Sequence, residues 1–287
     1  MLLFNKNHII YNSMKKYNPF FDYTNYDTYY TYFKQILMFP IACIRCCFLG
    51  FVIGSIYVSI KILDKKYRDS ILLYSARAWI YGFGYNNIKI KNKEFIKNAV
   101  TNKAIFIYNH GSFMDPYVIS SFIYPCTQVS YYKFYNMFKE FCVFFNFISI
   151  NDDIRYTLNS KKIVDHINNY KSIISIAPEG AVHNGTHLLK FRTGAFITSH
   201  PIQPIIIKYP NTYVKSTFSI NYSALFIIYN TLIQFSNSIE IELLPLQYRK
   251  EDELPIDFAE RIRVLMSEVS GIPMIDVYGY EKYNVHL

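Results

Sequence analysis

The stretch AIFIYNHGSFMDPYVI, residues 104–119, shows how the chain is organised. It begins as a β-branched and aromatic run, breaks at His110, and becomes apolar again after Asp115. This order predicts a buried strand over 104–108, then a loop, then a helix over 116–122. Because ligand-binding groups gather at the carboxyl ends of strands in an open α/β sheet, the loop is a candidate functional site.

The same alternation of strand-like and helix-like runs continues through residues 84–287. It predicts an α/β fold, with a mixed sheet flanked by helices. No repeat and no long low-complexity linker divides this part of the sequence, so we expect one domain of catalytic size. Further strands are expected at 87–90, 128–132, 147–150, 172–177, 204–208 and 238–244. Further helices are expected at 160–169, 194–199 and 256–270.

An apolar segment, ILMFPIACIRCCFLGFVIGSIYVSI, precedes this domain at residues 36–60. About twenty apolar residues suffice to cross a bilayer, but Pro40 and Arg45 interrupt the run. A transmembrane span, a helical hairpin and a deeply embedded helix with a snorkelling arginine all fit this pattern, as does a buried core helix. A basic cluster follows and would suit anionic headgroups on the cytoplasmic side. Its members are Lys61, Lys65, Lys66 and Arg68.

Composition divides the chain into three parts. Residues 1–35 are polar, without a strong period and without the short apolar core of a cleaved signal peptide. Residues 36–83 add a second apolar helix candidate at 71–83, so we expect membrane-associated helices there. The third part is the domain at 84–287, which the membrane-embedded helical segment precedes.

The net charge of +9 suits an anionic partner: a phospholipid surface, a CoA-like substrate or a nucleic acid. No nucleic-acid-binding motif is present, and such a function would not explain the apolar segment. The five cysteines show no regular framework, which indicates reduced thiols on a cytosolic face. Three of them, Cys43, Cys46 and Cys47, lie in the apolar segment, where core or lipid-facing positions and palmitoylation are the alternatives.

His110 and Asp115 are a candidate general base and its orienting carboxylate. A neutral imidazole accepts a proton from a hydroxyl, and a carboxylate on its other nitrogen fixes the tautomer and stabilises the imidazolium. No serine or cysteine nucleophile is needed if the attacking hydroxyl belongs to the substrate. The alternative is structural, since Asp115 followed by Pro116 is also typical of a helix N-cap with proline at the first position.

A second break of the same kind lies in SIAPEGAVHNGTHLLKFRTGAF, residues 175–196. An apolar run stops at a Pro-Glu-Gly turn that contains Glu179 and Gly180, and two cations, Lys190 and Arg192, follow closely. We expect the two breaks to form one site. A zinc site at His183 and His187 is not expected, since Asn-Gly between them discourages the helix that would align them and no acidic third ligand follows.

These two breaks resemble the signatures of the glycerolipid acyltransferase superfamily. NHGSFMD, which starts at Asn109, resembles its NHxxxxD motif, and APEGAVHNG…FRTGAF resembles its Pro-Glu-Gly block. HPIQPIIIKYPN is similar to a later block centred on a proline, here Pro204. The resemblance implies that His110 is the base for acyl transfer from a thioester to a lipid hydroxyl and that Asp115 orients it.

Finer features resemble the branch of lysophosphatidylcholine and lysophosphatidylethanolamine acyltransferases. They are the Asn-Gly at 184–185, the Asn-Pro-Phe lead-in at 18–20, the Phe-Pro…Arg pattern at 39–45 and the EIELLPL strand at 240–246. Where the family usually has threonines or Thr-Arg after the Glu-Gly, this chain has Ala-Val-His, and Arg155 is the nearest candidate for an arginine of the block between the two motifs.

The resemblance implies transfer of a fatty acyl group from acyl-CoA to a lysophospholipid acceptor, without a metal or a cofactor. We expect Asn109 and Lys190 among the substrate contacts and Arg192 on the phosphate. Glu179 is expected to accept hydrogen bonds from the acceptor hydroxyl or from backbone, or to hold Arg192. The Gly180 amide is expected to stabilise the oxyanion.

Alternative functions remain open within and outside this class. Lysophosphatidic acid or glycerol 3-phosphate is the alternative acceptor, and a catalytically silent membrane adaptor is the alternative from another class. The resemblance places the enzyme in a membrane, that of the endoplasmic reticulum, with a cytosol-facing active site.

Overall fold

The computed structural model describes residues 19–20, 28–64, 67–123, 126–137, 139–144, 147–150, 156–169, 173–210, 217–220 and 222–279. Several expectations fall outside these residues: Asn18 of the lead-in, Lys65 and Lys66 of the basic cluster, and Arg155.

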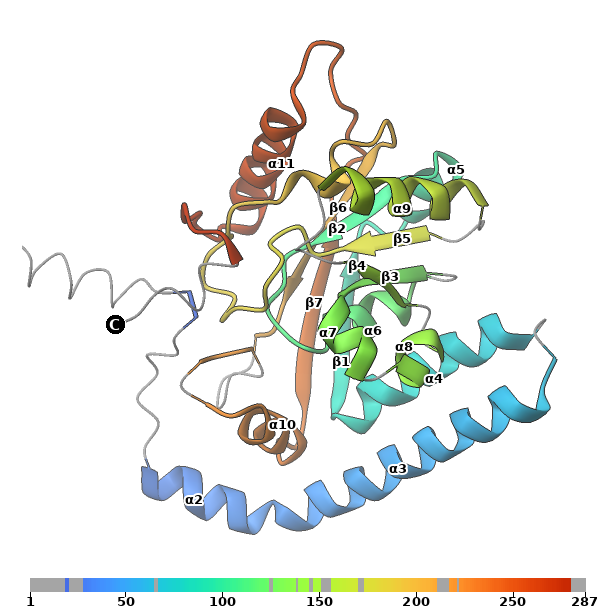
Figure 1. Ribbon diagram of the computed structural model, residues 1–287. Helices are drawn as coiled ribbons and strands as arrows, with labels where there is room; N and C mark the ends of the chain where they lie inside the picture. The colour runs from blue at the N-terminus through green and yellow to red at the C-terminus, as the bar shows by residue number, and fades with distance from the viewer. Residues whose placement is uncertain are drawn as a thin grey trace, which may run out of the picture.

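Seven strands of the described residues form one mixed sheet in the order β1-β7-β6-β2-β5-β3-β4 (Figure 1). Neighbouring strands are parallel except for the antiparallel pair β6 and β7. The mixed α/β fold and each expected strand are therefore confirmed. The strands are β1 (Tyr85–Lys91), β2 (Ile105–Tyr108), β3 (Cys126–Tyr131), β4 (Phe147–Ile150), β5 (Ile173–Ile176), β6 (Ile202–Lys208) and β7 (Asn237–Leu243).

The helices at 116–122, 160–169 and 256–270 are confirmed, as is the one at 71–83. The described helices are α2 (Thr28–Leu37), α3 (Phe39–Ile62), α4 (Arg68–Gly82), α5 (Phe95–Thr101), α6 (Asp115–Ser120), α7 (Tyr132–Met137), α8 (Lys139–Phe144), α9 (Tyr156–Asn169), α10 (Ala224–Leu232) and α11 (Pro255–Ser270).

Two expectations about helices were wrong. The helix expected at 194–199 is only the 3₁₀ turn η2 (Thr193–Ala195), which contains Gly194, a residue that disfavours a helix interior. Helix α2 lies mostly within residues 1–35, where we had expected no helix. The short helices α5, α7, α8 and α10 were also not expected.

Strand β2 lies inside the sheet and is buried on both faces. Ile105 and Ile107 belong to one apolar cluster, which α9 and α11 cover, whereas Phe106 and Tyr108 belong to another, which α4 and α6 cover. Burying a large apolar side chain contributes about 1.5–3 kcal/mol, so this double-sided packing fixes the strand firmly. The loop that follows β2 therefore starts from a rigid element.

Helix α3 contains the long apolar segment and continues from α2 along one edge of the molecule, below α10 and α4 (Figure 1). Its stretch Phe39–Ser59 is long and apolar enough to cross a membrane, and little of it is buried within the protein. Because a core helix would be mostly covered, the reading of this segment as a buried helix of a soluble core is wrong.

Arg45 of α3 does not snorkel as expected. Its guanidinium donates hydrogen bonds to the carbonyls of Leu232 at 2.6 Å, Gln234 at 2.5 Å and Phe235 at 3.0 Å, all at the end of α10. The last carbonyls of a helix lack intrahelical donors and carry partial negative charge, so a cation stabilises them. The one charge within the apolar run thus fastens α3 to the rest of the protein.

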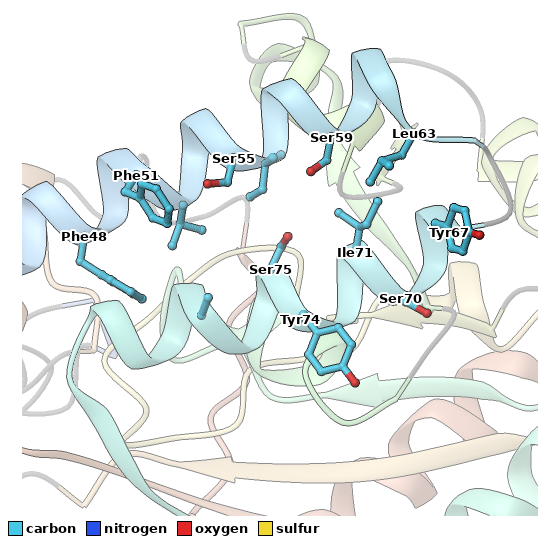
Figure 2. A pocket seen from close by; sticks show the side chains of 13 residues that line it. Phe48, Phe51, Ser55, Ser59, Leu63, Tyr67, Ser70, Ile71, Tyr74 and Ser75 are labelled. Carbon is cyan, nitrogen blue, oxygen red and sulfur yellow. The ribbon is translucent and has the colours of Figure 1, made fainter.

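A cavity of about 580 Å³ opens between α3 and α4. Figure 2 shows side chains of both helices turned toward it, among them Phe51 and Ser55 of α3 and Ile71 and Ser75 of α4. None of the candidate site residues lines this cavity. It belongs to the apolar helix pair and not to the loops after β2 and β5.

Candidate active site

The order of the strands brings three segments to one edge of the sheet. Strand β2 lies between β5 and β6 and is parallel to both, so the three carboxyl ends point the same way. His110 and Asp115 follow β2, Glu179 follows β5, and Tyr209 follows β6. The two breaks in the sequence therefore lie together, as expected, at one edge of the sheet.

His110 and Asp115 form a hydrogen-bonded pair. The distance between His110 Nδ1 and Asp115 Oδ2 is 2.9 Å, and the aspartate side chain is fully buried while the histidine is 18% exposed. Because the carboxylate accepts a hydrogen bond from the N–H at Nδ1, the lone pair of the imidazole is on Nε2. No other described side chain bonds to the ring, so Nε2 remains able to accept a proton from a substrate hydroxyl.

Asp115 is not a helix N-cap, so that alternative is wrong. The N-cap position of α6 belongs to Met114, and Asp115 is the first helical residue. Its Oδ2 also accepts a hydrogen bond from Ser112 N–H at 2.9 Å, and its Oδ1 accepts one from the hydroxyl of Tyr209. Three donors therefore hold the carboxylate in the orientation that His110 requires.

Tyr209 is a site residue that sequence reasoning missed. It lies directly after β6 in the KYPN segment, 94 residues away from Asp115 along the chain. Burial, followed by the negative charge of Asp115, raises the pKa of Tyr209 well above its ordinary value. The hydroxyl thus keeps its proton and remains a donor. Only the order of the strands brings it to Asp115, so no local pattern pointed to it.

Glu179 joins the two motif loops from inside the protein. Its side chain is fully buried, and its oxygens accept hydrogen bonds from His110 N–H at 2.5 Å, Leu189 N–H at 3.0 Å and His183 Nε2 at 2.9 Å. Of the expected roles, the acceptance of backbone hydrogen bonds is what the structure contains. Direct positioning of a substrate hydroxyl is corrected, since the carboxylate is covered and used by these donors.

His183, the last residue of the Ala-Val-His that follows the Glu-Gly, completes this connection. Its backbone N–H donates to the carbonyl of His110 at 3.0 Å, and its Nδ1 accepts from Gly185 N–H at 3.1 Å. Because Nδ1 is an acceptor, the proton is on Nε2 and points at Glu179. Both the N–H and the carbonyl of His110 are thus held by the Pro-Glu-Gly loop.

The Gly180 amide is not the oxyanion donor that we expected. Its N–H donates to the carbonyl of Ala177 at 3.2 Å, closing the turn. The backbone is left-handed at φ +69°, and a Cβ there would lie 2.5 Å from Arg192 Nε. Glycine is required at this position because Arg192 packs over the turn and because other residues are strained in this conformation.

Two further expected contacts also have other partners. Asn109 is buried and exchanges two hydrogen bonds with the backbone of Ile207, at 2.9 and 2.8 Å, which continues the pairing of β2 with β6. This corrects its assignment as a substrate contact. The Nζ of Lys190 lies 3.9 Å from Asp276 and over the ring of Tyr278, so it is partly held by the C-terminal segment.

The lead-in segment lies against the same loops. Asn184 N–H donates to the carbonyl of Pro19 at 2.8 Å, and Phe20 is buried.

Among the described residues, no group of three histidine, cysteine, aspartate or glutamate side chains is arranged to hold a metal ion. A reaction without metal therefore stays an expectation.

A hydrogen-bonded histidine–aspartate pair thus lies at the carboxyl edge of a mixed α/β sheet and is held by a Pro-Glu-Gly loop. Residues 87–208 match the family model described as Acyltransferase.

Proteins with related sequences are lysophospholipid acyltransferases by name. The chain is 29% identical over 227 residues to human lysophosphatidylcholine acyltransferase 1, a match that covers 76% of this chain and 42% of the relative. It is 26% identical over 243 residues to a lysophospholipid acyltransferase of Arabidopsis thaliana, covering 78% of this chain and 44% of that protein. The chain thus matches less than half the length of these relatives.

The fold is similar to that of a solved 1-acyl-sn-glycerophosphate acyltransferase from Thermotoga maritima. The TM-score is 0.54 at 15% sequence identity, and the match covers 83% of this chain and 97% of the other. At this identity the similarity concerns the fold alone.

Proposed function

We propose that the protein transfers a fatty acyl group from acyl-CoA to the free hydroxyl of a lysoglycerophospholipid and releases CoA. The observation that carries this proposal is the His110–Asp115 pair, whose buried carboxylate bonds to Nδ1 and leaves Nε2 as an acceptor. The family and the names of the relatives support the choice of acyl donor and acceptor class.

The chemistry follows from this geometry. His110 Nε2 takes the proton of the acceptor hydroxyl while the oxygen attacks the thioester carbonyl, and Asp115 stabilises the imidazolium that forms. The tetrahedral intermediate then collapses with cleavage of the carbon–sulfur bond. The proton passes from His110 to the CoA sulfur, which restores the neutral base. No covalent acyl-enzyme and no cofactor is needed in this scheme.

Arg192 is proposed as the contact for the acceptor phosphate. Its guanidinium packs over the exposed Gly180, next to the loop that holds His110, and its fork suits phosphate oxygens. Lys190, two residues away, adds a second positive charge, which Asp276 partly offsets. The fully buried Glu179 is not proposed to contact the phosphate.

The apolar helix α3 is proposed to hold the protein in a membrane. Exposed Ile44, Phe51 and Ile53 lie on a helix whose apolar surface is largely uncovered within the described residues. A lipid acceptor is delivered from the same membrane, which we propose to be that of the endoplasmic reticulum, with the site facing the cytosol.

An acceptor panel tests this proposal. Purified protein in lipid nanodiscs is incubated with one labelled acyl-CoA and, in turn, with lysophosphatidylcholine, lysophosphatidylethanolamine, lysophosphatidic acid and glycerol 3-phosphate. Acylation of a choline or ethanolamine lysophospholipid that disappears in His110→Ala supports the assignment. A product only with lysophosphatidic acid or glycerol 3-phosphate would move the protein to that acceptor class, and no product with any acceptor would favour a silent adaptor.

A further inference from the structure

Tyr209 gives Asp115 a hydrogen bond that the proposed mechanism does not itself require. The hydroxyl donates to Oδ1, whereas Ser112 N–H and His110 bond to Oδ2. The carboxylate partner of an imidazole acts through its negative charge, and every further donor attracts part of that charge. The tyrosine therefore influences how strong a base His110 is, in addition to holding the carboxylate in place.

We infer that Tyr209 is a positioning residue that sets the working pH of His110 by sharing the negative charge of Asp115. The inference rests on the proposed function, because it concerns the same general base. Tyr209 acts through Asp115 and is assigned no contact with the substrate.

The surroundings of Tyr209 keep its hydroxyl a donor. Burial and the charge of Asp115 raise its pKa, so it does not ionise in the pH range in which histidine titrates. The ring packs against Tyr85 of β1 in an edge-on contact, with 5.9 Å between ring centroids. This packing restrains the ring and aims the hydroxyl at Oδ1.

The other titratable groups around the pair come from three elements. Tyr108 of β2 meets the His110 ring edge-on at 6.0 Å, and its pKa is raised by burial and then by Asp115. Glu179, after β5, bonds to the backbone N–H of His110 and to His183. Tyr85 of β1 meets the Tyr209 ring edge-on and adds to the causes that raise the pKa of Tyr209, after burial and Asp115. Among the described residues, no lysine or arginine forms an ion pair with Asp115.

The direction of the effect follows from charge. The acid limb of kcat/KM reports the loss of the neutral imidazole as pH falls. In Tyr209→Phe, Asp115 directs more of its charge at His110, so the imidazolium is stabilised and the base is lost at a higher pH. A hydrogen bond to a charged group is strong enough to move the limb upward by roughly one pH unit.

The test compares pH profiles of the full-length protein in nanodiscs. Tyr209→Phe is measured beside Tyr85→Phe, which makes the same chemical change in the neighbouring buried ring. A second readout is the titration of the His110 ring by NMR in histidine-labelled protein, assigned with His110→Ala. The same titration is repeated with Tyr209→Phe in an Asp115→Asn background, where no carboxylate charge is left to share.

In Tyr209→Phe we expect both the acid limb of the kcat/KM profile and the titration of the His110 ring to move to higher pH. In Tyr85→Phe both should stay in place. When Asp115 is asparagine, Tyr209→Phe should no longer move the ring titration. A loss of activity with an unmoved limb and an unmoved ring titration would reduce Tyr209 to a packing residue and overturn the inference. If the wild type acylates no acceptor, the proposed function fails, and the ring titration alone decides the inference. Should Tyr209→Phe not fold, 3-fluorotyrosine at position 209, a stronger donor, must move both readouts to lower pH, and a failure to do so refutes the inference.

Discussion

Replacing Asp115 by asparagine separates the charge of the carboxylate from its shape. Ser112 presents a backbone N–H to Oδ2, and a backbone N–H can only donate, so the amide oxygen of asparagine must take that position. The amide NH₂ then faces Tyr209, whose hydroxyl can rotate and accept instead of donate. His110 keeps its acceptor on Nδ1 and therefore its tautomer. The substitution removes the negative charge and little else.

The size of the effect follows from the distance between the two charges. The His110 Nδ1 to Asp115 Oδ2 distance is 2.9 Å, so the centres of an imidazolium and a carboxylate are about 4 Å apart. At an effective dielectric constant of about 20, such a pair attracts by about 4 kcal/mol. Since about 1.4 kcal/mol corresponds to a factor of ten in rate, Asp115→Asn should lower kcat by about 10²- to 10³-fold.

Steady-state acyl transfer and thermal unfolding check this prediction together. Because the hydrogen bonds are preserved, we expect Asp115→Asn to unfold within a few degrees of the wild type, and the double variant with His110→Ala to lose little beyond the worse single one. Asp257→Asn is the matched control, since Asp257 lies in the first turn of α11 near a proline but is exposed and outside the site. If Asp115→Asn keeps more than about a third of wild-type kcat, the carboxylate is not the partner of a general base.

Three further predictions concern the loop after β5 and the apolar helix. In Glu179→Gln the amide NH₂ group would face hydrogen-bond donors in a fully buried position. The free energy of unfolding should therefore fall by about 1–3 kcal/mol, and the melting temperature should fall with it. The control Glu251→Gln, at an exposed position, should change neither. Arg192→Ala should raise KM for the phosphorylated acceptor by roughly 10- to 100-fold, from the loss of a charge-assisted hydrogen bond, and equal rises for acceptor and acyl-CoA would contradict this role. Full-length protein should stay in membranes washed with carbonate, because each CH₂ of α3 buried in lipid contributes about 0.8 kcal/mol, and its release would refute the anchor.

The sequence alone was sufficient to predict the strands and the pairing of His110 with Asp115. Strands buried on both faces, such as β2 and β6, appear as short β-branched runs whatever their neighbours are, because their pattern depends only on burial. His110 and Asp115 are five residues apart in one loop, so the local chain brings them together. The division at residues 35 and 83 stays a prediction.

Contacts between distant segments were decided only by the tertiary structure. Glu179 is 69 residues from His110, Tyr209 is 94 from Asp115, and Arg45 is 187 from Leu232. Sequence patterns report which side chains are buried, but they do not report which strands are neighbours, and it is the order β6-β2-β5 that gathers the site. For the same reason, the sequence suggested that the Gly180 amide and Asn109 were available to bind substrate. In the folded protein the Gly180 N–H closes a turn, and the Asn109 side chain continues the pairing of two strands.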